Sequence, residues 1–214
     1  MKVLVIACHP DDEVIGVGGT ILKHIEKGDT VDVCIVTVAS DPEWDDDYRE
    51  NKLKEQGKVD NFLGVRSRYF FGHTTLELNN LDRGRFNQDF ITLIKDVNPD
   101  IIYTHFNHDL NEEHNLVSRG TLIGTRIPNK STVYMYETSS TRFSLIPFKP
   151  NYYVKLSWNI LQAKINAFNM YESEVKISPH PRSSSGIRYS AFYRGDEIGV
   201  KYAEAFIQVR RLWR

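Results

Sequence analysis

VLVIACHPDDEVIGVGGTILKHIEKGDTVDVCIVTV, residues Val3–Val38, decides the fold class of this chain. The stretch opens with a short apolar run, Val3–Cys8, which is typical of a strand covered on both faces. Gly16–Lys27 then carries apolar residues at helical spacing and is closed by Gly28, and Val31–Val38 is a second, β-branched strand. This order of strand, helix and strand predicts a βαβ unit.

The alternation of strands and helices continues beyond Val38. Helices are predicted at 48–63, 85–97 and 112–125, and short strands at 69–71, 101–104 and 133–136. Strands separated by amphipathic helices imply crossovers within a parallel sheet. We therefore predict an α/β fold, with a Rossmann-like, mostly parallel sheet, helices on both faces and one domain over 1–214. In the C-terminal third we expect an extended segment, a helix, a Pro- and Ser-rich loop and a basic final helix at Phe148–Val154, Trp158–Tyr171, Ser178–Gly186 and Tyr202–Arg214.

Composition and charge exclude several classes of function. The chain has 27 Lys plus Arg against 28 Asp plus Glu, so its net charge of −1 provides no field to hold a nucleic acid. No stretch approaches the roughly 20 apolar residues that span a bilayer, and the start of the chain lacks a signal-peptide cleavage site. Cys8 and Cys34 lie in apolar runs, where thiols act as small hydrophobes. We therefore predict a cytoplasmic protein with no nucleic-acid partner and no membrane span.

Polar side chains gather directly after four of the predicted strands. The four clusters are His9–Glu13, Ser40–Asp47, Gly72–Thr75 and His105–His114. In open α/β sheets, ligands bind at the carboxyl ends of the strands. The four loops are therefore expected to converge, and the active site is predicted at that edge of the sheet.

Two of these clusters contain the residue types of a catalytic metal site. His9 and Asp12 lie three residues apart on a tight turn, so both can reach one cation, and mixed nitrogen and oxygen ligation suits zinc. His114 could supply a third ligand from the start of the following helix. Two histidines and one carboxylate with an open position are typical of a catalytic zinc site. Asp11, between two proposed ligands in the sequence, would be free to act as a base.

Simpler interpretations of the same residues exist. A single histidine is more often a surface or hydrogen-bonded residue than a ligand. The carboxylates of Asp11–Glu13 could merely favour the positive end of the first helix. Gly16, Gly18 and Gly19 could indicate a phosphate cradle, but their spacing departs from Gly-x-Gly-x-x-Gly and the neighbouring carboxylates would repel phosphate. These glycines are better explained by close packing of the helix on the sheet.

At these residues the chain resembles the PIG-L/LmbE-like family of zinc-dependent N-deacetylases. The segment Ala7–Glu13, ACHPDDE, with Gly18-Gly19-Thr20 shortly after, matches the family's usual (A/P)HPDDE and GGT start. Further similarity covers nearly the whole chain and runs through Tyr48-Arg49, Leu63-Gly64-Val65, Asp109-Leu110-Asn111, His114, Tyr136–Thr141, His180–Ser183, Arg194-Gly195 and Tyr202–Phe206.

The resemblance implies a role for each residue of the predicted site. His9, Asp12 and His114 would bind Zn²⁺, and Asp11 would be the general base. Arg49 matches an arginine that contacts substrate in relatives. Many relatives carry a histidine where this chain has Asn111, so either Asn111 or His105 is expected to stabilise the oxyanion.

We therefore predict a zinc-dependent hydrolase that removes an N-acetyl group from an amino-sugar substrate. Such a substrate could be a glycoside, a sugar nucleotide or a glycoconjugate, and related enzymes are often homo-oligomers. Two alternatives stay open: a metal-dependent hydrolase of another amide or ester bond, and a non-catalytic sugar-binding protein on the same scaffold. A base placed between two metal ligands argues against the second, because binding alone does not require it.

Overall fold

The computed structural model describes residues 1–39, 44–126 and 130–211. Seven strands form one sheet in the order β3-β2-β1-β4-β5-β7-β6. The elements are β1 (Lys2–Ala7), α1 (Asp12–Glu26), β2 (Thr30–Val38), α2 (Asp46–Leu63), β3 (Ser67–Thr74), η1 (Leu78–Asn80), α3 (Arg83–Val97), β4 (Ile101–His105), α4 (Glu112–Gly124), β5 (Thr132–Tyr136), η2 (Ser140–Phe143), β6 (Tyr152–Lys155), α5 (Trp158–Asn169), α6 (Ser184–Asp196) and β7 (Ala203–Arg210).

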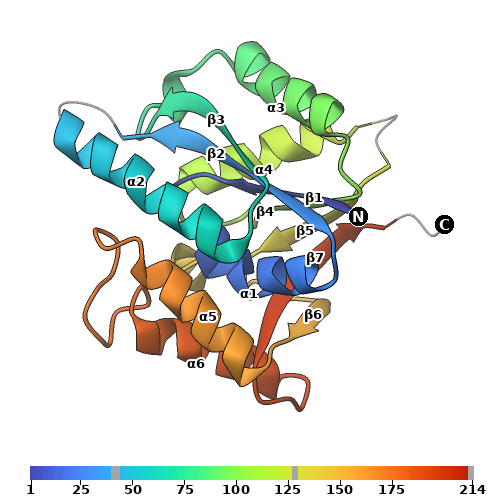
Figure 1. Ribbon diagram of the computed structural model, residues 1–214. Coiled ribbons are helices and arrows are strands. Elements are labelled where there is room, and N and C mark those ends of the chain that lie inside the picture. The colour runs from blue at the N-terminus through green and yellow to red at the C-terminus, as the bar shows by residue number, and fades with distance from the viewer. Residues whose placement is uncertain (40–43, 127–129, 212–214) are drawn as a thin grey trace.

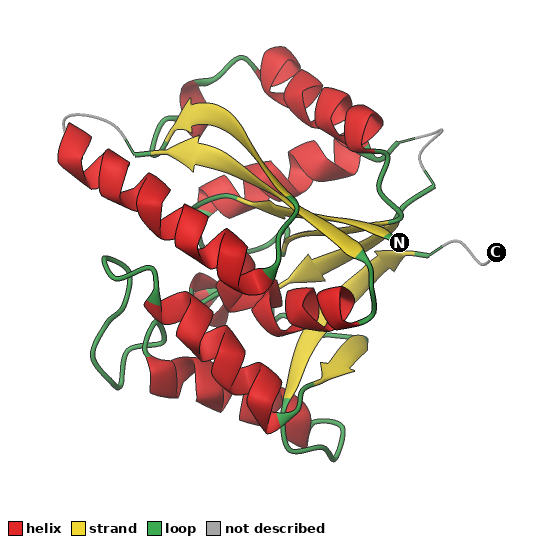
Figure 2. Ribbon diagram, viewed as in Figure 1, coloured by secondary structure: helices red, strands yellow, loops and turns green. Residues whose placement is uncertain are grey.

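The first five strands are parallel, and the last two are not. β3, β2, β1, β4 and β5 pair in parallel, whereas β7 runs antiparallel to both β5 and β6. Figure 1 shows α3 and α4 on one face of the sheet and α1, α2 and α5 on the other, and Figure 2 shows the same layers by element type. The predicted α/β class, with a mostly parallel sheet covered on both faces, is confirmed.

The central strand β1 explains why both faces must be covered. Val3, Val5 and Ala7 belong to the core beneath α1 and α5, whereas Leu4 and Ile6 belong to the core beneath α3 and α4. Successive side chains of a strand point to opposite faces, so an unbroken apolar run needs a helical layer on each side. Cys8 and Cys34 are both free and fully buried, as their apolar surroundings indicate.

Two predictions for the C-terminal third are wrong. The segment predicted as a final helix, Tyr202–Arg214, contains strand β7 over its described part. β7 is inserted between β5 and β6, and these strand pairings override the helical propensity of its Ala and Glu residues. The Pro- and Ser-rich loop is shorter than expected, because α6 begins at Ser184 with the Ser183 hydroxyl accepting a hydrogen bond from Gly186 N at 3.0 Å.

Three further points concern the segments outside the described residues, the predicted absence of a membrane span and the domain organisation. Residues 40–43 of the predicted acidic loop and 212–214 of the predicted final helix lie outside the described residues. Among the helices that the structure describes, each is too short or too polar to cross a bilayer. The organisation as a single domain stays a prediction.

Close packing of α1 on the sheet depends on Gly16. A Cβ atom built there would collide with the Tyr136 ring. We expect Gly16→Ala to lower the free energy of unfolding by about 1–3 kcal/mol through overpacking. Gly57→Ala is the control, because a Cβ in the middle of α2 meets nothing within 4 Å. This substitution should raise the free energy of unfolding by roughly 0.5–1 kcal/mol. Urea denaturation compares the two, and equal stability of the Gly16→Ala variant and the parent would contradict the close approach.

Candidate active site

The predicted loops converge at the carboxyl ends of the parallel strands. A cavity of about 840 Å³ lies there. Its lining includes His9, Asp11 and Asp12 after β1, and Asn111 and His114 after β4. The lining also includes Thr75 after β3, Trp44, and Ser139 and Ser140 after β5. The segment between α5 and α6 contributes Glu174, His180, Pro181 and Arg182.

Three of the predicted residues form a nearly equilateral triangle of potential ligand atoms. Asp12 Oδ2 lies 3.2 Å from His9 Nδ1 and 3.3 Å from His114 Nε2. The two histidine nitrogens are 3.3 Å apart. Donors held about 2.0–2.1 Å from a tetrahedral Zn²⁺ lie about 3.4 Å from each other. Both the spacing and the donor set of two imidazoles and one carboxylate therefore fit a single divalent cation.

Cys8 and His105 also lie close enough to this centre to be considered as metal ligands, but the protonated state of Cys8 and a hydrogen bond to His105 argue against both. Each forms a group with His114 and one further ligand in which the ligand atoms lie within 4.8 Å of one another. Burial raises the pKa of the Cys8 thiol to about 11, which keeps it protonated. His105 Nε2 accepts a hydrogen bond from Cys8 N at 2.9 Å. His9, Asp12 and His114 therefore remain the best ligand set.

Two buried carboxylates lie against the rings of His9 and His114. Glu113 Oε2 lies 2.9 Å from His9 Nε2, and Asp109 Oδ1 lies 3.5 Å from His114 Nδ1. Burial alone would raise the pKa of Asp109, but the hydrogen bond and charge of His114 hold it at about 2. Carboxylates behind histidine ligands fix the ring orientation and increase ligand basicity. Both residues belong to the His105–His114 cluster, and Asp109 lies in a segment that resembles the family, but no role was predicted for either residue.

Asp11 has an unusual backbone conformation. Its φ of 125° lies in a region that residues with a side chain rarely adopt. The Asp11 N–H donates to Glu13 Oε2 at 3.1 Å, and Arg68 and Tyr171 hold Glu13 in turn. Strained residues of this kind cost about 1–3 kcal/mol and cluster at functional sites. The surrounding network therefore fixes the position of the Asp11 side chain in the cavity.

The Asp11 carboxylate is buried, and one of its oxygens has no hydrogen bond. The residue is 3% exposed, and Oδ2 lacks a hydrogen-bond partner among the described residues, the nearest cation being Arg182 Nη1 at 3.6 Å. Burial, together with the charges of Asp12 and Glu174, raises the pKa of Asp11 well above its ordinary value. A carboxylate placed beside a ligand triangle with a free lone pair is suited to accept a proton.

The two oxyanion candidates occupy different places. Asn111 lines the cavity, and its Oδ1 caps α4 by accepting from Glu113 N at 2.9 Å. This leaves the Asn111 amide nitrogen as the donor for a ligand. His105 is 0% exposed and stacks on His114 with ring centroids 4.0 Å apart, so it lies behind the cavity wall. Burial and the neighbouring His114 lower the pKa of His105 well below its ordinary value, which favours a neutral ring.

Arg49 is not among the residues that line the cavity, whereas Lys52 is. The Arg49 guanidinium donates to the Trp44 carbonyl at 3.1 Å and pairs with Asp46. Lys52 is 7% exposed, lines the cavity and pairs with Glu174 at 2.9 Å. Lys52 follows Tyr48 by four residues, so both lie on one face of α2. That spacing was the signal in the sequence that could have identified Lys52.

Comparison with known proteins places this centre in a family. Residues 4–123 match the family described as GlcNAc-PI de-N-acetylase, PIG-L. Diacetylchitobiose deacetylase from Thermococcus kodakarensis is 26% identical over 221 residues, covering 95% of this chain and 81% of that protein.

Two solved structures have the same fold. N,N'-diacetylchitobiose deacetylase from Pyrococcus horikoshii, complexed with an inhibitor, is 25% identical with a TM-score of 0.75, over 96% of this chain and 82% of that one. The conserved protein TT1542 from Thermus thermophilus gives a TM-score of 0.80 at 20% identity, over 99% and 96% of the two chains. The resemblance seen in the sequence is confirmed, and the chain belongs to the PIG-L family of de-N-acetylases.

Proposed function

We propose that this protein is a Zn²⁺-dependent hydrolase that removes an N-acetyl group from an amino-sugar substrate. The observation that carries the proposal is the triangle of His9 Nδ1, Asp12 Oδ2 and His114 Nε2, with sides of 3.2–3.3 Å. Beside it lies the buried Asp11 Oδ2, which has no hydrogen bond to any described residue. A triangle of this size suits one cation with an open position, and the free carboxylate suits a base.

Each side chain at the centre would have a separate task. His9, Asp12 and His114 would hold Zn²⁺, which, when bound, supplies a Lewis acid that acidifies water and polarises a carbonyl group. Glu113 and Asp109 would keep the two imidazole rings in the ligating orientation. The protein therefore supplies three ligands and leaves space on the cavity side for water and substrate.

Asp11 would move the proton that the reaction requires. Hydrolysis adds the hydroxyl of water to the acyl carbon and breaks the bond from that carbon to nitrogen. Asp11 Oδ2 would take the second proton of the water and deliver it to the departing amine. Asn111 would donate from its amide nitrogen to the oxygen of the acyl group, where negative charge develops. His105 lies behind His114, so Asn111 is our preferred donor.

The wall that contains Trp44, Tyr48 and Lys52 suits the sugar. The rings of Trp44 and Tyr48 lie 6.3 Å apart and both line the cavity, which gives apolar surface for a sugar face. Glu174 accepts hydrogen bonds nearby from Tyr48 Oη at 3.0 Å and Lys52 Nζ at 2.9 Å. The two diacetylchitobiose deacetylases among the similar proteins support a substrate with an N-acetylated sugar. Contact between Arg49 and substrate, a cytoplasmic location and a homo-oligomer stay predictions.

A panel of substrates tests the proposal. Amine release is measured from N-acetylglucosamine, N,N'-diacetylchitobiose and an N-acetylated sugar nucleotide. For the alternatives, phosphate release is measured from a phosphomonoester and acetate release from a simple acetate ester. We expect hydrolysis of at least one N-acetylated sugar, its loss after chelation, and recovery on adding Zn²⁺. Activity confined to an ester or a phosphoester would favour the alternative of a metal-dependent hydrolase that acts on another bond. Binding of these sugars without any turnover would favour the non-catalytic alternative.

A further inference from the structure

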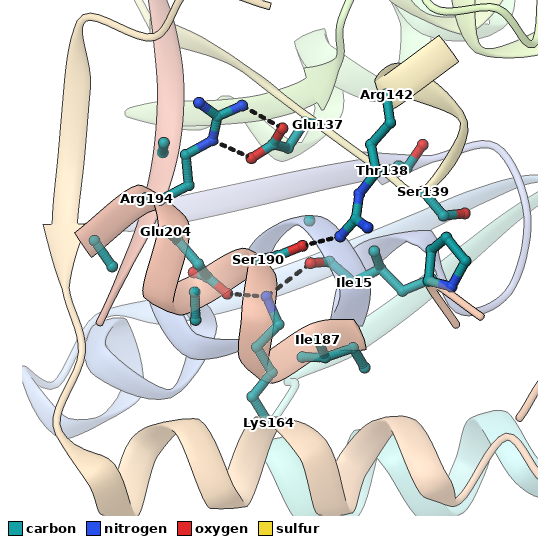
Figure 3. Close-up of a pocket in the computed structure, with 15 residues that line it drawn as sticks. Ile15, Glu137, Thr138, Ser139, Arg142, Lys164, Ile187, Ser190, Arg194 and Glu204 are labelled. Carbon is teal, nitrogen blue, oxygen red and sulfur yellow. Dashed lines mark hydrogen bonds and ion pairs between the residues drawn. The ribbon is translucent and has the colours of Figure 1, made fainter. Parts of the chain in front are cut away.

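A second, smaller cavity lies directly behind one wall of the large one. It measures about 40 Å³ and is the cavity drawn in Figure 3. Ile15, Ser139 and Pro181 line both cavities, so these three residues form a shared wall between them. The two cavities therefore adjoin at this shared wall.

Ile15 lies beside the proposed base. Its backbone N–H donates to the Asp11 carbonyl at 2.9 Å, so Ile15 lies one turn beyond Asp11, which precedes α1, and both residues line the large cavity. On its other side Asp11 faces Arg182, which pairs with Glu174 at 2.9 Å. An amide between these two sides would direct its polar sugar to the charged groups and its apolar acyl chain to Ile15.

A buried ion pair holds the shared wall in place. Lys164 reaches from α5 to the Ile15 carbonyl at 2.7 Å and to Glu204 Oε1 at 2.6 Å, as Figure 3 shows. Glu204 in turn accepts from Gly19 N at 2.8 Å, which anchors the next turn of α1. Since α1 is tied to α5 and β7 at this point, the Ile15 backbone cannot retreat to admit a longer chain.

The small cavity is suited to a short apolar group. Four of its five charged residues pair with each other, since Lys164 pairs with Glu204 and Arg194 pairs with Glu137 at 2.6 Å. The fifth, Arg142, donates to the Ser190 hydroxyl. Other parts of the lining are aliphatic and include Ile187, Ala191, Ala203 and Ala205. A cavity of this kind needs about 10–15 Å³ for each water-sized group. At about 40 Å³, it therefore has room for about three or four such groups.

We infer that Ile15 sets the acyl specificity of this enzyme by separating the two cavities. With isoleucine in place, the space beside Asp11 ends after the methyl group of an acetyl chain. Shortening the side chain joins the cavities and admits N-propionyl and N-butyryl groups. The inference rests on the proposed function, because it requires that the protein hydrolyses N-acylated amino sugars.

The test compares kcat/KM for N-acetyl, N-propionyl and N-butyryl forms of the same sugar from the panel. We expect the parent protein to prefer acetyl over butyryl at least about 10-fold, which is the discrimination that one or two methylene groups give in a tight pocket. Ile15→Ala should reduce that preference by about 10-fold or more, and Ile15→Val should shift it in the same direction for propionyl. Ile15→Val removes one methyl group only, so it tests the inference if the alanine variant does not fold.

Ile25→Ala is the matched control, since Ile25 is partly buried on the same helix and lines neither cavity. Its acyl preference should equal that of the parent. An unchanged preference in folded Ile15→Ala and Ile15→Val, with the parent active on the N-acetyl sugar, would overturn the inference alone. A parent protein that hydrolyses none of the N-acylated sugars overturns the proposed function instead.

Discussion

Replacing Asp11 with asparagine should lower kcat by about 10²–10⁴-fold, the usual contribution of a general base, while the protein keeps its metal. Asparagine preserves the size of the side chain and tolerates positive φ better than most residues, so the backbone at φ 125° can be retained. The amide cannot take the proton from water. Because Asp11 lies outside the ligand triangle, metal content should stay at the parent level.

Steady-state amine release and metal analysis of the same gel-filtered sample separate these two effects. Asp47→Asn is the control, since Asp47 is exposed in the first turn of α2 and does not line the cavity. Undiminished turnover in Asp11→Asn would defeat the assignment of Asp11 as base. Loss of metal together with turnover would instead show that Asp11 helps to hold the cation.

Replacing His114 with alanine should remove both metal and activity. Its Nε2 lies 3.3 Å from both of the other ligand atoms, so the substitution opens one whole corner of the triangle. Loss of an orienting outer partner typically costs about 10–100-fold in metal affinity or activity, and loss of a ligand should exceed that. Glu113→Gln keeps all three proposed ligands and alters the partner of His9, and Glu113 also accepts a hydrogen bond from Leu76 N at 2.8 Å. The loss of metal affinity in this variant should therefore fall within that smaller range.

Competition with a chromogenic chelator measures the affinities of the parent and the two variants. His73→Ala is the control for removing a histidine, because His73 pairs with Asp89 and does not line the cavity. Parent-like affinity in His114→Ala would refute the ligand triangle. Equal losses in Glu113→Gln and His114→Ala would mean that Glu113 itself ligates the metal.

The parallel part of the sheet could be predicted because its signals are local. Val3–Cys8 and Val31–Val38 are uninterrupted apolar runs, and their flanking helices have clear spacing and glycine stops. The order of these elements then leaves few topologies, since parallel crossovers are right-handed and short. The observed pairing of β1 with β2 and β4 follows from that pattern.

The C-terminal third could not be predicted in the same way. Ala203–Arg210 contains Ala, Glu and Gln, which favour helices, but in the structure it is held as a strand by β5 and β6 on either side. Its first four residues are buried on both faces, so a simple alternation of apolar and polar residues is absent. The start of α6 had a signal in Ser183, a favoured N-cap residue, which the surrounding serines obscured.

The candidate site shows the same difference between residues with local sequence signals and residues brought in by long-range packing. His9, Asp11 and Asp12 form a local motif, and His114 follows a predicted strand, so the sequence suffices to bring them together. The contact between Glu113 and His9 joins residues 104 positions apart, and Arg182 reaches Asp11 from the other end of the chain. Such partners depend on the final packing, and no local spacing reveals them.

The position of β7 and β6 at one border of the sheet has a consequence for how such proteins can diversify. The proposed ligands and base depend on β1 and β4 in the middle of the sheet, whereas Pro181, Arg182 and Glu174 come from segments that precede β7. Evolution can therefore change the C-terminal third, and with it the substrate, while the residues proposed for hydrolysis stay the same. A chimera that exchanges this third with a relative should acquire the donor's substrate range and keep its own metal affinity.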